Sequence, residues 1–131
     1  WVGYSITESM DGGLYLGLRE GKHGKETIQD AVEAVHDIDG VSALCIMHSG
    51  IKHTLDGLKI LREFTSLPIG AYAHSIKPSK DPTDEWEAVV VTDVEEYAHH
   101  ASEWVLAGAT IVGGCCGVTP DHIKGLTNNL R

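Results

Sequence analysis

Apolar residues recur along the chain in two alternating patterns, one typical of helices and one typical of buried strands. Between Ile28 and Val35 they fall at positions i, i+3, i+4 and i+7, and this spacing predicts a helix over 27–37. The nearly unbroken apolar run from Val41 to Met47 has the length of a strand buried on both faces of a parallel sheet. Further strands are predicted over 2–7, 68–73 and 110–112, and further helices over 51–64, 92–107 and 119–130.

The last two helices carry start signals of their own. Thr92 and Glu95 are spaced as in a capping box, in which both side chains bind free amides of the first helical turn. Thr119 has the position of an N-cap. We expect Asp121 and His122, in the first turn after it, to serve the amino terminus of that helix rather than the chemistry.

Two segments between these elements show no periodicity. The first, 8–24, holds five glycines, and the second, 75–92, is polar and contains Trp86. Loops of this length inside a compact domain are usually functional or disordered. Either could cover a pocket, although ordinary loop residues would give the same pattern.

The pattern as a whole is four consecutive units of a strand followed by a helix. Such alternation requires parallel strands joined by right-handed crossovers, which is an α/β fold. The chain of 131 residues is long enough for one modest domain, and no linker divides it. We therefore expect a single domain over 1–131.

Composition removes several classes of function. The net charge is -9, and no basic patch is present to neutralise phosphates, so we expect no nucleic-acid partner. No apolar run approaches the roughly 20 residues that span a bilayer, and we expect no membrane partner. The three cysteines are an odd number and two of them are adjacent, which favours reduced thiols and a cytoplasmic location.

The cysteines are the candidate chemistry. Cys115 and Cys116 lie in the Gly-rich turn after the fourth predicted strand, and Cys45 lies near the predicted carboxyl end of the second. Because active residues of parallel α/β folds collect at that edge, we expect the three thiols to converge there. Three protein ligands leave zinc an open fourth position, as in catalytic zinc sites. Taken alone, Cys45 could equally be a small core residue.

The run from Val112 to Ile123 resembles the carboxyl-terminal signature of the homocysteine S-methyltransferases. Gly113 to Cys116 match the Gly-Gly-Cys-Cys of that family, and Thr119 to Ile123 match its helix start. Ala43 to Cys45 stand where the family has its third zinc cysteine, with Leu44 in place of the usual Asn. The segment 70–75 is similar to the family's next strand, with His74 in the place of an Asn.

This resemblance implies that the chain is the carboxyl-terminal half of a (β/α)8 TIM barrel. It implies zinc held by Cys45, Cys115 and Cys116, and methyl transfer to the thiol of homocysteine, giving methionine, from S-methylmethionine, betaine or a similar small donor. The residues that we expect to contact substrate are at the same rim: Gly114, His74, Tyr72 and His48.

Four units leave a barrel half open, so the resemblance also implies self-association or a missing amino-terminal half. Two other functions stay open at this point. A half-barrel without turnover would be a metal-binding or assembly module, and the adjacent cysteines would also suit a redox protein.

Overall fold

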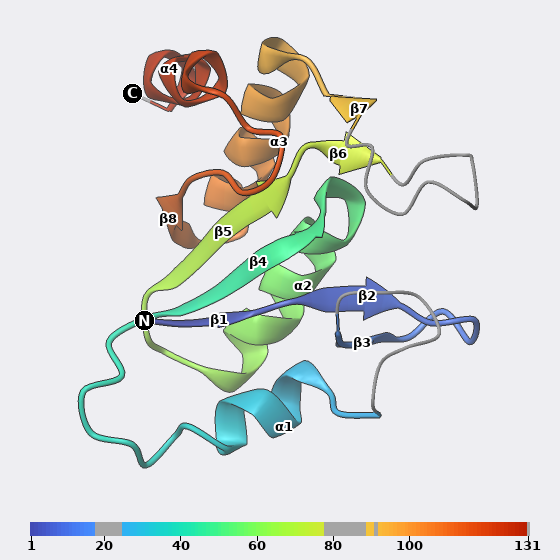
Figure 1. Ribbon diagram of the computed structural model, residues 1–131. Coiled ribbons are helices and arrows are strands. Elements are labelled where there is room, and N and C mark those ends of the chain that lie inside the picture. The colour runs from blue at the N-terminus through green and yellow to red at the C-terminus, as the bar shows by residue number, and fades with distance from the viewer. Residues whose placement is uncertain (18–24, 78–88, 91, 131) are drawn as a thin grey trace.

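The structure, a computed structural model, describes residues 1–17, 25–77, 89–90 and 92–130. Its centre is a four-stranded sheet in the order β1 (Val2–Tyr4), β4 (Leu44–Gly50), β5 (Ile69–His74) and β8 (Ala109–Val112), seen obliquely in Figure 1. Every pairing within this sheet is parallel. The α/β architecture with a parallel sheet is therefore confirmed.

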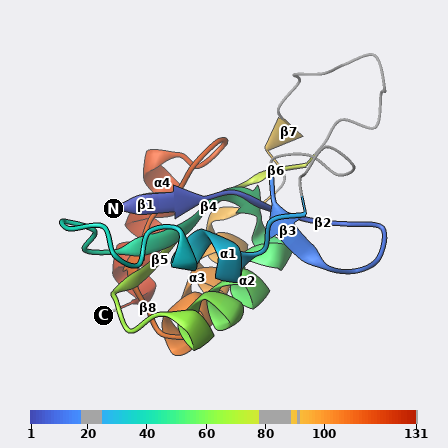
Figure 2. The same ribbon diagram turned by 90° about the horizontal axis from the view of Figure 1, so that it is seen from below.

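Helices follow the four strands in turn. They are α1 (Ile28–Glu33), α2 (Ile51–Phe64), α3 (Val94–Leu106) and α4 (Pro120–Asn129). The bounds of α2 are those predicted, whereas α1 ends four residues early. After Glu33 the α-helical hydrogen bonds give way to the tighter 3₁₀ pattern, in which the N–H groups of Val35 and His36 bond to carbonyls three residues back. Figure 2 shows α1, α2 and α3 on one side of β1.

The core lies between the sheet and the helices. Ile46 of β4 faces α2, since a Cβ added at Gly57 of that helix would meet the Ile46 side chain. On α3 the buried side chains are Tyr97, Ala98, Ala101 and Trp104. Val105 of the same helix is 42% exposed.

The first predicted strand, over 2–7, is divided between two sheets. After β1 the chain leaves the parallel sheet, and β2 (Ile6–Glu8) pairs antiparallel with β3 (Leu14–Leu16). The β3 strand lies in a segment predicted to be a loop. The amide of Ile6 donates to Ser49 Oγ at 2.9 Å, which ties this hairpin to the end of β4.

The second strand begins three residues later than predicted. Residue 41 still belongs to the preceding turn, with the Val41 amide bonded to Ile38, and pairing with the segment before β5 starts at Leu44. The strand then continues to Gly50 rather than ending at Met47. Cys45 is therefore the second residue of β4 and not one of its last.

The segment predicted as a long loop over 75–92 holds two short strands, β6 (Ile76–Lys77) and β7 (Val89–Val90), which pair antiparallel. Trp86 lies outside the described residues. The N-cap of α3 lies one residue later than predicted, because the carboxylate of Asp93, and not the side chain of Thr92, accepts the Glu96 amide at 2.8 Å. Among the described helices none has the length and apolarity to cross a membrane.

Candidate metal centre

The turn after β8 is fastened to the carboxyl end of β5. The Cys115 amide donates to the Ala73 carbonyl at 3.1 Å, and the Ser75 amide donates to the Cys116 carbonyl at 2.9 Å. Gly117 leaves the turn with φ +77°, a left-handed conformation that a side chain would strain. Backbone bonds thus hold both cysteines at the edge where the strands end.

His48, near the end of β4, brings an imidazole to this turn. Its Nδ1 lies 3.3 Å from the Sγ of Cys115 and 3.3 Å from the Sγ of Cys116, and the two sulfurs are 3.7 Å apart. All three side chains are partly exposed. Among the described residues, their ligand atoms form the group that is close enough together to hold a metal ion.

These separations suit a tetrahedral metal ion. Zinc with Zn–S of about 2.3 Å and Zn–N of about 2.0 Å places two sulfurs about 3.8 Å apart and a nitrogen about 3.5 Å from each sulfur. The observed 3.7 and 3.3 Å are close to those values. One imidazole and two thiols are also ligands that zinc favours, so the donor set fits the ion that the resemblance implies.

Burial makes the Cys115 thiol reluctant to ionise without a cation. The pKa of Cys115 is raised, first by burial and also by the sulfur of Cys116 beside it. Near neutral pH the Cys115 thiol therefore keeps its proton until a positive charge is bound. A metal ion would supply that charge, because coordination deprotonates a thiol.

The third expected thiol is not brought to this group. Cys45 has no exposed surface, and its Sγ lies next to Gly70, its partner in the neighbouring strand. Burial raises the pKa of the Cys45 thiol as well. The expected cluster of three sulfurs is thus replaced, within the described part of the chain, by two sulfurs and the His48 ring.

The other residues predicted to contact substrate surround the group without joining it. His74 packs edge-on against His48, with ring centroids 5.7 Å apart, and burial lowers the pKa of His74, as does the charge of His48. The pKa of Tyr72 is raised by burial, and further by the thiols of Cys45 and Cys115. A Cβ at Gly114 would collide with the side chain of Val118, so that position requires glycine for packing.

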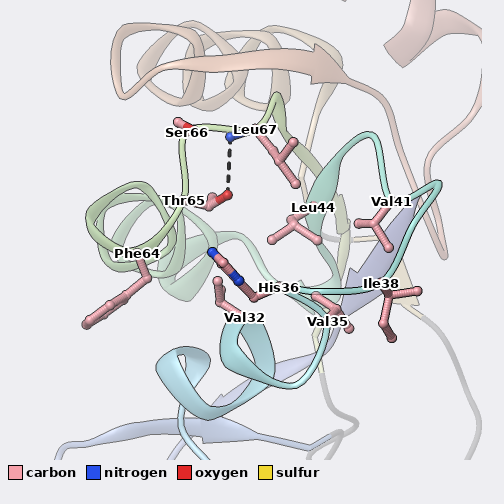
Figure 3. Close-up of a pocket in the computed structure, with 10 residues that line it drawn as sticks. All are labelled: Val32, Val35, His36, Ile38, Val41, Leu44, Phe64, Thr65, Ser66 and Leu67. Carbon is pink, nitrogen blue, oxygen red and sulfur yellow. Dashed lines mark hydrogen bonds between the residues drawn. The ribbon is translucent and has the colours of Figure 1, made fainter.

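A cavity of about 300 Å³ lies elsewhere, at the amino ends of the strands. Figure 3 shows Val32 of α1 and Val35, in the turn after that helix, on the side of the cavity opposite Leu44 and the segment 64–67. Seven of its ten lining residues are apolar, and His36 is its one imidazole. In parallel α/β folds, ligands bind at the carboxyl ends of the strands, so the cavity does not compete with the cysteine turn as the candidate site.

Sequence reasoning placed His48 at the rim but took it for a pocket residue rather than a donor. The signal that was available is its position: it lies three residues after Cys45, where the strand ends. No sequence pattern indicates the backbone conformation of His48. Among the described non-glycine residues it alone has a positive φ, of +48°.

Comparisons with known proteins agree on one family. The family model described as homocysteine S-methyltransferase matches residues 1–130. A selenocysteine methyltransferase of Astragalus bisulcatus is 30% identical over 102 residues, which cover 77% of this chain and 30% of that protein. The homocysteine S-methyltransferase YbgG of Bacillus subtilis (strain 168) is 30% identical over 84 residues, which cover 64% of this chain and 26% of YbgG.

A solved structure shows the same likeness in three dimensions. The metallated form of the homocysteine methyltransferase MmuM from Escherichia coli superposes with a TM-score of 0.62 at 26% identity, covering 85% of this chain and 33% of that one. The chain therefore spans about a third of the length of the relatives it matches.

Proposed function

The chain belongs to the homocysteine S-methyltransferase family, and from that membership we propose that it carries the zinc-binding part of an enzyme that methylates the thiol of homocysteine. The observation that carries this proposal is the group of His48, Cys115 and Cys116 at the carboxyl edge of the sheet. It lies where parallel α/β enzymes place their catalytic residues.

Bound zinc would supply a substrate thiolate at neutral pH, because coordination lowers the pKa of a thiol that is otherwise protonated. The thiolate lone pair then forms a bond to the methyl carbon of a sulfonium or quaternary ammonium donor. The bond from that carbon to the donor's sulfur or nitrogen breaks, and its electron pair leaves with a neutral thioether or amine. S-methylmethionine, a sulfonium, and betaine, a quaternary ammonium, are both donors of this kind.

The chain's own residues would bind and orient the reactants. Tyr72 keeps its proton because its pKa is raised, so its hydroxyl can donate a hydrogen bond to substrate. His74 stays neutral near pH 7, because burial lowers its pKa, and offers one donor and one acceptor beside the metal group. Holding sulfur, methyl carbon and leaving group in line is the main contribution that such residues make.

The architecture we propose is one half of a (β/α)8 barrel. Four strand–helix units are half of the eight that such a barrel needs, and the chain covers 33% of MmuM. The remaining strands would come from further residues of a longer polypeptide or from a second copy of this chain. Without that other half, the chain would lack part of its substrate contacts.

One test is methionine formation from homocysteine with S-methylmethionine or betaine, measured together with zinc content. We expect one zinc per chain, and we expect Cys116→Ala to lose both the zinc and any turnover. Substoichiometric zinc that is unchanged in the Cys115→Ala and Cys116→Ala variants would overturn the proposal.

A second function is favoured by the edges of the sheet. Both β1 and β8 lack a further partner strand among the described residues, as expected of a half-barrel that assembles with something else. In this alternative the chain binds metal but has no turnover of its own. Zinc binding without methyl transfer would support it, and robust turnover by the isolated chain would exclude it.

A further inference from the structure

The identity of the third metal ligand follows from the geometry around β4. We propose that His48, through Nδ1, completes the metal site with Cys115 and Cys116, and that Cys45 takes no part. This inference rests on the proposed zinc-dependent function and replaces a site of three thiolates by one of two thiolates and an imidazole.

Distances favour the imidazole over the third thiol. The Nδ1 atom of His48 is equally far, 3.3 Å, from both sulfurs of the turn, as a ligand that shares an ion with them would be. Cys45 precedes His48 by three residues, which is roughly 10 Å along a strand. Its Sγ is enclosed between β4 and β5 at Gly70, so reaching the turn would require β4 to shift its register.

The backbone of β4 departs from regular strand geometry at His48, and this departure sets the direction of the His48 side chain. Side chains alternate along a strand, so His48 would lie on the same face as Ile46, which packs against α2. Instead the register shifts between Met47 and Gly50, and His48 takes a left-handed φ of +48°. Bulges of this kind redirect side chains next to active sites, and here the redirected ring meets the two sulfurs.

Neighbouring groups keep the ring in place. His74 packs edge-on against it from the end of β5, and Ser49 bonds to the Met47 carbonyl at 2.7 Å while accepting the Ile6 amide. The bulge is thus held from both sides, by β5 and by the hairpin of β2 and β3. Metal sites depend on such surrounding contacts to orient their ligands.

The changed ligand set changes the charge of the site. Two thiolates and a neutral imidazole balance the charge of Zn²⁺, whereas three thiolates leave a net charge of -1. A substrate thiolate would therefore approach a neutral centre rather than a negative one. This is the electrostatic consequence that distinguishes the two sites.

Cobalt substitution tests the ligand set without any assay of turnover. Co²⁺ bound by thiolates shows a near-ultraviolet charge-transfer band whose intensity grows with the number of thiolates. The purified chain would be titrated with Co²⁺ under anaerobic conditions, and the metal affinity measured by competition with a chelator. The variants are His48→Cys, His48→Asn and Cys45→Ala, with His53→Ala as a matched control on a nearby histidine outside the group.

We expect His48→Cys to raise the band by about one half, because a third thiolate joins two. His48→Asn, which tolerates the left-handed backbone, should weaken metal affinity at least about tenfold. Cys45→Ala and His53→Ala should leave band and affinity unchanged. A band that falls by one third in Cys45→Ala, with unchanged affinity in His48→Asn, would overturn this inference while leaving the zinc function intact. A wild-type chain that binds neither Co²⁺ nor Zn²⁺ would overturn both.

Discussion

Burial divides the three thiols into two chemical classes. Cys45 is 0% exposed and its pKa is raised by burial, so it offers neither access nor a thiolate. Cys115 and Cys116 are partly exposed in the turn after β8. Their sulfurs, 3.7 Å apart, are free thiols.

This difference predicts a labelling pattern. In metal-free protein, at a pH alkaline enough to ionise the two partly exposed thiols, iodoacetamide should add to them quickly and to the third only after unfolding in urea, as counted by intact mass. The Cys45→Ala variant should show the same two rapid additions and no slow one. Three additions at one common rate in the folded protein would contradict the burial of Cys45.

At the scale of single residues, sequence reasoning located the cysteine turn correctly because its Gly-rich pattern is local. It placed Cys45 too near the end of its strand, because the start of β4 depends on where pairing with the segment before β5 begins, which no local pattern shows. It could not place the His48 ring beside the two sulfurs, since the bulge and the positive φ arise from tertiary contacts.

Among the elements, α4 is anchored through a buried histidine in its first turn. His122 is 4% exposed, and its Nδ1 accepts from the amide of Thr119 at 3.1 Å. Its Nε2 therefore carries the proton and donates to the Thr92 carbonyl, ahead of α3, at 3.1 Å. The expectation that His122 serves the helix start is confirmed, and the ring also joins α4 to α3.

Replacing this ring should destabilise the fold. His122→Ala removes the cap and leaves the buried Thr92 carbonyl without its donor, so we expect a loss of about 2–3 kcal/mol. The urea midpoint measures it, with Asp121→Ala, an exposed neighbour in the same turn, as the control. Equal midpoints for both variants would show that the ring does not hold the two helices together.

Strands β4 and β5 are in contact through Cys45 and Gly70. A Cβ at Gly70 would lie 2.8 Å from the Cys45 Sγ and 2.8 Å from the Ile111 Cβ. Gly70→Ala should therefore cost about 1–3 kcal/mol by overpacking. Adding Cys45→Ala removes one of the two clashes. The double variant should therefore lose less stability than the sum of the losses of the two single variants, by at least about 0.5 kcal/mol. Additive losses in a denaturation series would refute this contact.

Element types were predictable where periodicity was strong, as for α2 with its leucines at helical spacing. The hairpin of β2 and β3 was missed because its strands are three residues long and lie in a Gly-rich segment. The early end of α1 was missed because the apolar pattern continues through Val35 while the hydrogen bonds have already shortened.

On the scale of the whole molecule, the open edges of the sheet are the feature that our barrel proposal must explain. Strands β1 and β8 form the two ends of the described parallel sheet. Exposed edges promote pairing with other chains. The parallel pairing of the strands was predictable from the alternation of patterns, but no pattern in these residues predicts what pairs with the two edge strands.

We expect the isolated chain to associate as its concentration rises, measured by sedimentation velocity. Thr110→Lys places a charge on the exposed side of β8 and should shift the distribution toward monomer. Gln29→Lys, which adds the same charge on exposed helix surface, should not. A monomer at every concentration would argue against an edge that needs a partner.

X-ray absorption at the zinc edge tests the metal centre most directly. For the zinc-loaded chain we predict two sulfur neighbours at about 2.3 Å and nitrogen or oxygen neighbours at about 2.0 Å, one of them the His48 imidazole. A first shell with three protein sulfurs would contradict the site of two thiolates and one imidazole. A shell with no sulfur would contradict the metal centre itself.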